Sequence, residues 1–151
     1  MQIVKAGTRD LETVRHITQF TIDEIYPHYY PRGAVEFFKA HHSDSHIMED
    51  LGNGRVFLLY EDGCAAGTVT VKDNEICRLF VLPAYQHKGF GRVLMDFAEG
   101  EIIKHCDEIE LDASLPAKRI YLQRGYTEIS THRIPTDHGD YLCYDRMRKA
   151  R

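Results

Sequence analysis

The sequence has 151 residues, of which 43% are hydrophobic and 28% are charged, proportions typical of a soluble globular domain. We therefore predict a single domain over residues 1–151. The 19 Lys and Arg residues against 23 Asp and Glu residues give a net charge of −4, and no long basic run is present that could bind a phosphate backbone. These numbers argue against a nucleic-acid partner.

The cysteines and the first residues of the chain indicate in which cellular compartment the protein works. The four cysteines, Cys64, Cys77, Cys106 and Cys143, show no C-x-x-C spacing and fit free thiols in a reducing cytosol. Residues 1–5 lead into polar sequence without an apolar signal segment, and no window approaches the ~18 apolar residues of a membrane span. We therefore expect a soluble, cytoplasmic protein with no membrane partner.

The first half of the chain predicts a strand, a helical region and then three strands. A strand at 1–6 precedes a helix that Thr8 would cap and that ends near Ile25, because prolines follow. Residues 31–51 indicate a second helical region. Short apolar runs separated by turn residues then predict antiparallel strands at 56–60, 64–71 and 75–82.

The second half alternates helices and strands. An amphipathic helix runs from Gly91 to about 103, followed by a strand at 109–111. A short helix at 117–124 is closed by a glycine, and strands at 126–131 and 141–147 follow. Helices interspersed with strands favour an α/β fold around one mixed sheet.

The loop between the strand ending at Leu82 and the following helix carries the strongest functional signal. Its sequence is Gln86-His87-Lys88-Gly89-Phe90-Gly91-Arg92. The N-terminus of a helix presents free N–H groups and the positive end of the helix dipole, so a glycine-containing loop that enters a helix can bind an anion. The loop lacks the third glycine of a dinucleotide fingerprint and the G-K-[ST] of a Walker loop. On its own, it could equally form a plain strand-to-helix turn.

Two segments resemble the GNAT superfamily of N-acetyltransferases. Residues 86–91 match its Q/R-x-x-G-x-G/A acetyl-CoA signature, after a strand that reads RLFVLP at 78–83. Residues 117–126 are similar to its A-x-x-x-Y-x-x-x-G-F/Y segment. The resemblance implies a GNAT-like α/β fold, with a mixed, mostly antiparallel sheet of about seven strands. Helices would cover both faces, and the sheet would splay at the strand ending near Leu82.

The resemblance also implies acetyl-CoA as co-substrate, with no metal. Backbone groups of the splayed strand would pair with the pantetheine arm, and loop amides would hold the pyrophosphate. Ser114 stands where the family often carries Asn, and its hydroxyl could contact the same arm. The implied coenzyme-binding residues are Leu79, Phe80, Val81, Leu82, Gln86, His87, Lys88, Gly89, Phe90, Gly91, Arg92 and Ser114.

Two residues are implied as catalytic by the same resemblance. Acetyl transfer to an amine needs a base, because an alkyl ammonium has a pKa near ~10, and it needs an acid for the departing thiolate. Glu75 stands at the position of the family's base, which acts directly or through water, and Tyr121 at that of its acid. The alternatives are a solvated turn acid for Glu75 and a core tyrosine for Tyr121.

The acceptor side is less determined. Tyr26, Tyr29, Tyr30 and Tyr144 are candidate substrate-binding residues, although they could instead serve packing near the prolines. A small-molecule amine is the expected acceptor and a peptide amine the alternative. A non-catalytic acyl-CoA sensor is the alternative of another class. The oligomeric state stays open, a homodimer included.

Four histidines precede the strand predicted at 56–60, and their spacing raises the question of a metal site. His42 and His46 are four residues apart, but a zinc site needs further ligands, and the serines at 43 and 45 indicate a helix break. We therefore expect no metal. The sequence assigns no role to His28, His41, His42 and His46.

Overall fold

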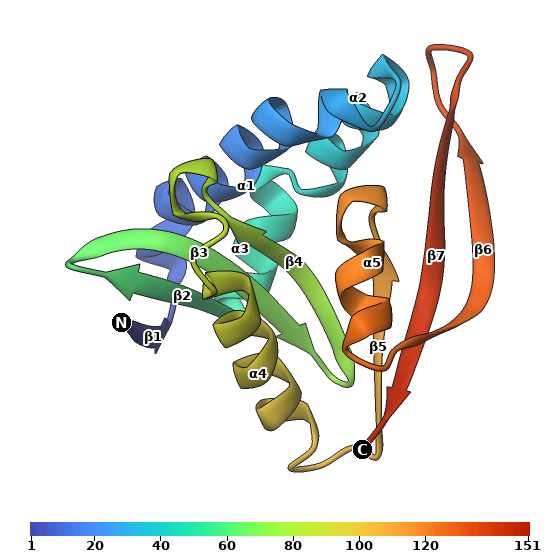
Figure 1. Cartoon of the computed structure of the whole chain (residues 1–151). Helices are drawn as coiled ribbons and strands as arrows, with labels where there is room; N and C mark the ends of the chain where they lie inside the picture. The colour runs from blue at the N-terminus through green and yellow to red at the C-terminus, as the bar shows by residue number, and fades with distance from the viewer.

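One seven-stranded sheet organises the chain, and the computed structural model describes all 151 residues (Figure 1). The strands are β1 (Gln2–Lys5), β2 (Val56–Glu61), β3 (Cys64–Lys72), β4 (Glu75–Val81), β5 (Glu108–Ala113), β6 (Thr127–Pro135) and β7 (Tyr141–Ala150). The α-helices are α1 (Leu11–Ile25), α2 (Arg32–His41), α3 (Asp44–Gly52), α4 (Phe90–Ile102) and α5 (Leu115–Gln123). Short 3₁₀ turns lie at Thr8–Asp10, Tyr26–His28 and Pro83–Tyr85.

The sheet is antiparallel except at its centre. Its order is β1-β2-β3-β4-β5-β7-β6, and only β4 and β5 run parallel. These two strands pair at two positions, Glu75 with Glu110 and Ile76 with Leu111, and then diverge (Figure 1). The predicted mixed, mostly antiparallel α/β fold is confirmed, and the splay opens along the strand that ends at Val81.

Helices cover both faces of the sheet because each carries one apolar stripe. Leu94, Ala98 and Ile102 recur at helical spacing along α4 and are fully buried against β3 and β4. On the other face, Val14 and Ile17 of α1 enter a second apolar cluster, which α2 and α3 complete. The gap between β4 and β5 therefore opens toward helices on either side.

Of two local predictions at helix ends, one needs correction. Thr8 does not cap α1: it begins a 3₁₀ turn, and the Asp10 carboxylate accepts the Gly7 N–H at 2.8 Å. The helical region predicted at 31–51 has the break that the serines indicated: it forms two helices, and Ser43, in an extended conformation, is the N-cap residue of α3. The break turns α3 back beneath α1, with which it packs.

A β-bulge interrupts β4 beside the gap. Thr70 pairs with Cys77 and Thr68 with Phe80, so β4 holds one residue more than β3 over this stretch. Arg78 has a φ of +43°, a left-handed conformation that is rare outside glycine. A bulge bends its strand, and here it coincides with the divergence of β4 from β5.

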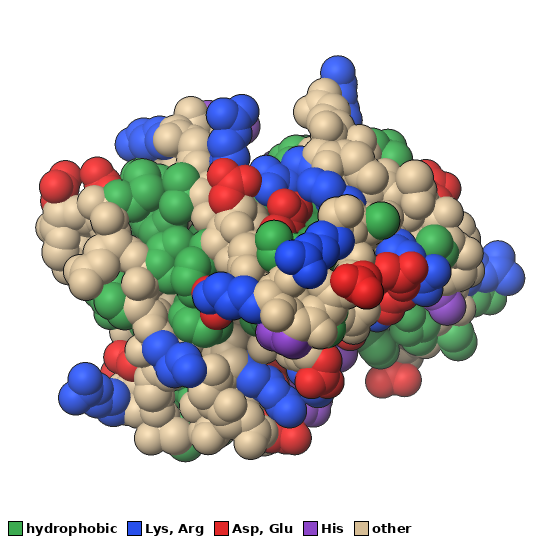
Figure 2. All heavy atoms as spheres, turned by 90° about the horizontal axis from the view of Figure 1, so that it is seen from below, with side chains coloured by type: hydrophobic (Ala, Val, Ile, Leu, Met, Phe, Trp, Pro, Cys, Tyr) green, Lys and Arg blue, Asp and Glu red, His purple; other side chains and the backbone are tan.

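None of the helices has the length and apolar character needed to cross a membrane. The view from below shows basic and acidic side chains interspersed rather than segregated (Figure 2). Many of them are paired, as are Arg148 with Glu110 at 2.6 Å and Arg124 with Glu99 at 2.9 Å.

Candidate active site

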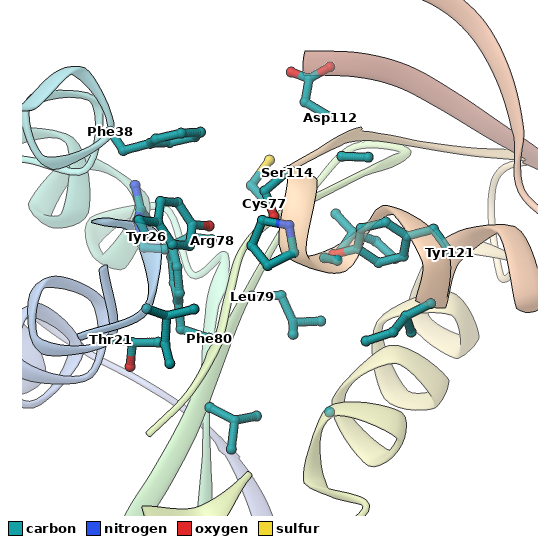
Figure 3. A pocket seen from close by; sticks show the side chains of 18 of the residues that line it. Thr21, Tyr26, Phe38, Cys77, Arg78, Leu79, Phe80, Asp112, Ser114 and Tyr121 are labelled. Carbon is teal, nitrogen blue, oxygen red and sulfur yellow. The ribbon is translucent and has the colours of Figure 1, made fainter. Parts of the chain in front are cut away.

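A cavity of about 570 Å³ lies where β4 and β5 separate. The residues of β4 run between two groups of lining side chains (Figure 3). Phe38 and Tyr26 lie on one side, while Ser114 and Tyr121 lie on the other. The cavity therefore connects the α1–α2 side of the sheet with the α4–α5 side.

The glycine-containing loop forms one end of this cavity. Gly89 is the N-cap residue of α4 with a φ of +87°, and a Cβ built on Gly89 or Gly91 would meet only open space. These glycines let a ligand approach the first N–H groups of α4 without a side chain in between. Arg92 lines the same end. The arrangement suits a phosphate or pyrophosphate.

Most of the predicted coenzyme-binding residues meet in the cavity wall. These are Leu79, Phe80, Val81, Gln86, His87, Gly89, Gly91, Arg92 and Ser114. Three others lie outside the lining: Leu82, Lys88, whose Nζ lies 5.8 Å from the ring centroid of Tyr85, and Phe90, which is buried in the core. The Gln86 amide donates to the Val81 carbonyl at 2.9 Å and thereby ties the loop to the end of β4.

A buried polar network, absent from the sequence predictions, holds the bulge. The Arg78 side chain is 4% exposed and donates from Nη1 to Asp50 Oδ2 at 3.0 Å and to Thr70 Oγ1 at 3.1 Å. Its Nε donates to Nδ1 of His42 at 3.3 Å. Burial and the adjacent Arg78 charge hold the pKa of His42 well below its usual value. Arginine in a strand is normally exposed, so the sequence offered no signal for this network.

Tyr121 reaches the cavity from α5. Its ring packs edge-on against Tyr126, with centroids 5.9 Å apart. Burial raises the pKa of the Tyr121 phenol, and the nearby Tyr26 hydroxyl raises it further. Burial likewise raises the pKa of Tyr26 to about 12. Both phenols are therefore protonated at neutral pH and can donate hydrogen bonds into the cavity.

Glu75 lines the opposite part of the cavity and is ion-paired. Arg146 Nη1 lies 3.1 Å from Glu75 Oε1 and 3.1 Å from Asp112 Oδ1, and its Nη2 lies 2.9 Å from Glu110 Oε2. Glu75 and Asp112 both line the cavity. Arg146 is absent from the sequence-based predictions. The signal was present, because arginines at alternate positions of β7 face acids at alternate positions of β5.

The four predicted acceptor-binding tyrosines separate into two pairs. Tyr26 and Tyr144 line the cavity, whereas Tyr29 and Tyr30 do not. Tyr29 is 52% exposed on the surface. Tyr30 is buried, and its hydroxyl accepts the Leu115 N–H at 2.6 Å. The 3₁₀ turn at Tyr26–His28 directs Tyr26 and Tyr30 inward, where their rings lie 5.5 Å apart.

Three of the four histidines lie together, since the ring centroid of His41 is 5.0 Å from that of His42 and 6.1 Å from that of His46. His42 accepts from Arg78, the Nδ1 of His46 contacts the His41 carbonyl oxygen at 2.8 Å, and His28 is exposed. His41 lies at the cavity wall. No group of three or more His, Cys, Asp or Glu side chains is arranged to hold a metal ion.

Comparisons with known proteins connect this geometry to a family. Residues 9–147 match the family described as acetyltransferase (GNAT) domain. A GCN5-related N-acetyltransferase from Rhodopseudomonas palustris superposes with a TM-score of 0.89 at 20% identity, covering 99% of this chain and 95% of that one. No curated protein sequence shows significant similarity.

Two further solved structures share the fold. The PaiA N-acetyltransferase of Thermoplasma acidophilum, solved with coenzyme A, has a TM-score of 0.76 at 21% identity and covers 99% of this chain and 98% of that one. The ribosomal-protein-S18-alanine N-acetyltransferase of Escherichia coli has a TM-score of 0.72 at 22% identity, with coverages of 99% and 92%.

Proposed function

Because the chain belongs to the GNAT acetyltransferase family, we propose that it transfers the acetyl group of acetyl-CoA to a primary amine by direct attack in a ternary complex. One observation carries the proposal. A single cavity connects the phosphate-binding end of α4 with Tyr121 on one side of the sheet and Glu75 on the other. Coenzyme and amine can therefore meet in the gap between β4 and β5.

The coenzyme would bind mainly through backbone. Beyond Ile76, β4 has no partner on its β5 side, so peptide groups of this strand could pair with an extended pantetheine arm, although the Val81 carbonyl already accepts from the Gln86 amide. The pyrophosphate would lie at the N-terminus of α4, beside Gly89 and Gly91. The bulge at Arg78 would bend β4 toward this position. The buried ion pair between Arg78 and Asp50 would hold the bulge in place.

In the transfer step, the amine nitrogen bonds to the thioester carbonyl carbon and the carbon–sulfur bond breaks. Tyr121 supplies a proton to the departing thiolate. The raised pKa disfavours a free phenolate, so the phenol would donate a hydrogen bond to the thiolate as it forms. When its proton moves to the sulfur, the phenolate would regain a proton from solvent. A site that stabilises charge only as it forms accelerates the reaction rather than substrate binding.

Glu75 would accept the proton of the acceptor ammonium. Its pairing with Arg146 holds the carboxylate in place, and its oxygens retain further lone pairs for the amine or for a bridging water. Arg146 is thus a positioning residue in this scheme. Ser114, at the N-terminus of α5, would contact the pantetheine arm.

Acetyl-CoA turnover, read as released thiol over a panel of primary amines, tests the proposal. Amine-dependent thiol release with an acetylated product is the expected result. Binding of acetyl-CoA without turnover of any amine would instead identify a coenzyme-sensing domain. The panel should include small amines and a peptide with a free N-terminus, because these are the two acceptor classes in question.

A further inference from the structure

The acceptor end of the cavity, on the α1–α2 side, has apolar walls. Its apolar side chains come from α1, α2, β6 and β7: Ile25, Phe37, Phe38, Ile134 and Tyr144. All five are half-buried, and all pack on the apolar cluster beneath α1–α3. Their remaining exposed surface contributes to the cavity lining. An occupant with an apolar body would remove that surface from water, which stabilises a complex in proportion to the apolar area covered.

The same end carries a local negative charge. Glu75 and Asp112 reach it from β4 and β5, and the cluster around them holds four carboxylates, Glu75, Glu108, Glu110 and Asp112, against Arg146 and Arg148. Glu108 and Glu110 lie outside the cavity lining, and Arg78, which belongs to the lining, is paired with Asp50. The two lining carboxylates share the single charge of Arg146, which leaves an excess of one negative charge. Such a site attracts an ammonium group.

His41, at the wall of this end, does not cancel that charge. Burial, together with His46 and Arg78, lowers the pKa of His41, while Asp112 and Glu75 oppose the shift only in part. The imidazole is therefore neutral at pH 7. Its ring stacks on Phe37, with centroids 6.3 Å apart and planes 11° from parallel, and so extends the flat wall.

Two hydrogen bonds bridge the open side of the gap. The Tyr30 hydroxyl accepts the Leu115 N–H at 2.6 Å, which joins the α1–α2 connection to α5. The Asp140 carboxylate accepts the Gly33 N–H at 3.0 Å, which joins α2 to the β6–β7 hairpin (Figure 1). A Cβ on Gly33 would collide with the Thr136 hydroxyl and the Asp140 carboxylate, so any other residue here would displace these two side chains. The two bonds therefore tie the α1–α2 region to α5 and to the β6–β7 hairpin across the gap.

We propose that the acceptor is a small primary amine with a flat apolar body, an arylalkylamine in chemical terms. Its ammonium group would lie at Glu75 and Asp112, and its ring would pack against Phe37, Phe38 and Tyr144. This inference rests on the proposed acetyltransferase function and narrows its acceptor. A polyamine, and a peptide whose first side chains are small, both carry an ammonium group but lack the flat apolar body that would cover the exposed surface of Phe37, Phe38 and Tyr144.

Three acceptors test the inference on the intact protein: 2-phenylethylamine, 1,4-diaminobutane and a short peptide with an N-terminal alanine. With acetyl-CoA saturating, kcat/KM for 2-phenylethylamine should exceed the other two at least tenfold, the scale on which apolar pockets discriminate. Equal or reversed preference would overturn the inference while leaving the transferase proposal intact. Absence of turnover with all three and with the wider amine panel would overturn both.

Variants of Phe37 test whether the preference for 2-phenylethylamine arises at the apolar wall. Phe37→Ala should raise KM for 2-phenylethylamine about tenfold without changing KM for acetyl-CoA, and Phe37→Leu, which preserves more of the packing, should raise it less. Phe20→Ala is the matched control, because Phe20 is 43% exposed on α1 and does not line the cavity. An amine KM that is unchanged in Phe37→Ala, or raised equally in Phe20→Ala, would exclude Phe37 from the acceptor site.

Discussion

The two ends of the cavity are built in different ways. The proposed coenzyme end consists largely of backbone: peptide groups of β4 and the first N–H groups of α4, within one stretch from Leu79 to Arg92. The acceptor end consists of side chains from α1, α2, β4, β5, β6 and β7. Backbone recognition needs only a bulge, a gap and small residues, so it tolerates change in surrounding side chains. Side-chain recognition ties the acceptor to this particular sequence.

Removing the Tyr121 hydroxyl should have the largest effect at the coenzyme end. Tyr121→Phe should lower kcat by ~10²-fold with acetyl-CoA affinity unchanged, because one positioned acid contributes about that factor. Steady-state kinetics and calorimetry measure the two quantities. The control is Tyr126→Phe, a tyrosine beside Tyr121 that is 2% exposed and donates to Glu99 away from the cavity. A similar fall in both variants would point to packing rather than acid catalysis.

At the acceptor end, Glu75→Gln should lower kcat between ten- and a hundredfold at pH 7, because Asp112 lies nearby and replaces the base in part. The acid limb of the pH–rate profile should move to higher pH, since the amine must then lose its proton to solvent, with a pKa near ~10. Glu110→Gln is the control: it removes another ion pair of Arg146, and Glu110 does not line the cavity. An unmoved acid limb would remove Glu75 as the base.

Gly89→Val should weaken acetyl-CoA binding about tenfold, equivalent to roughly 1.4 kcal/mol, because its side chain would fill the space beside the first N–H groups of α4. Valine at positive φ also strains the backbone. Gly63→Val separates the two effects, since Gly63 has a φ of +77° in the β2–β3 turn, outside the cavity. Equal affinity losses in the two variants, measured by calorimetry, would contradict an anion site at Gly89.

The smallest expected effect concerns stability. His42 is neutral in the folded protein because burial and Arg78 lower its pKa, whereas in the unfolded chain it titrates near 6.5. Below pH 6.5 the unfolded state binds the extra proton, so stability is lost as the pH falls. Between pH 6.5 and 5.5, wild type should lose about 1 kcal/mol more unfolding free energy than His42→Asn. Urea titrations measure this difference, and equal losses would contradict it.

The contrast between the two ends explains what the sequence could predict. The loop at 86–92 is contiguous, and its glycines and helix start follow local rules, so its place at the head of α4 agrees with expectation. Tyr29 and Tyr30 could not be separated, because a 3₁₀ turn determines which ring points inward. The local pattern of residues around Arg78 predicts a regular strand. The left-handed backbone conformation of Arg78 is accompanied by hydrogen bonds to Asp50 and His42, which are distant in sequence and so could not be predicted from it.

The gap between β4 and β5 also has a consequence for the life of the protein in a cell. Unpaired peptide groups at the centre of a sheet weaken it, and a bound coenzyme arm would act as the missing strand. A ligand present at 100 times its dissociation constant adds about 2.7 kcal/mol to stability. The folded population, and with it resistance to proteolysis, would then rise and fall with the supply of acetyl-CoA. The protein's abundance would thus follow the metabolite it consumes.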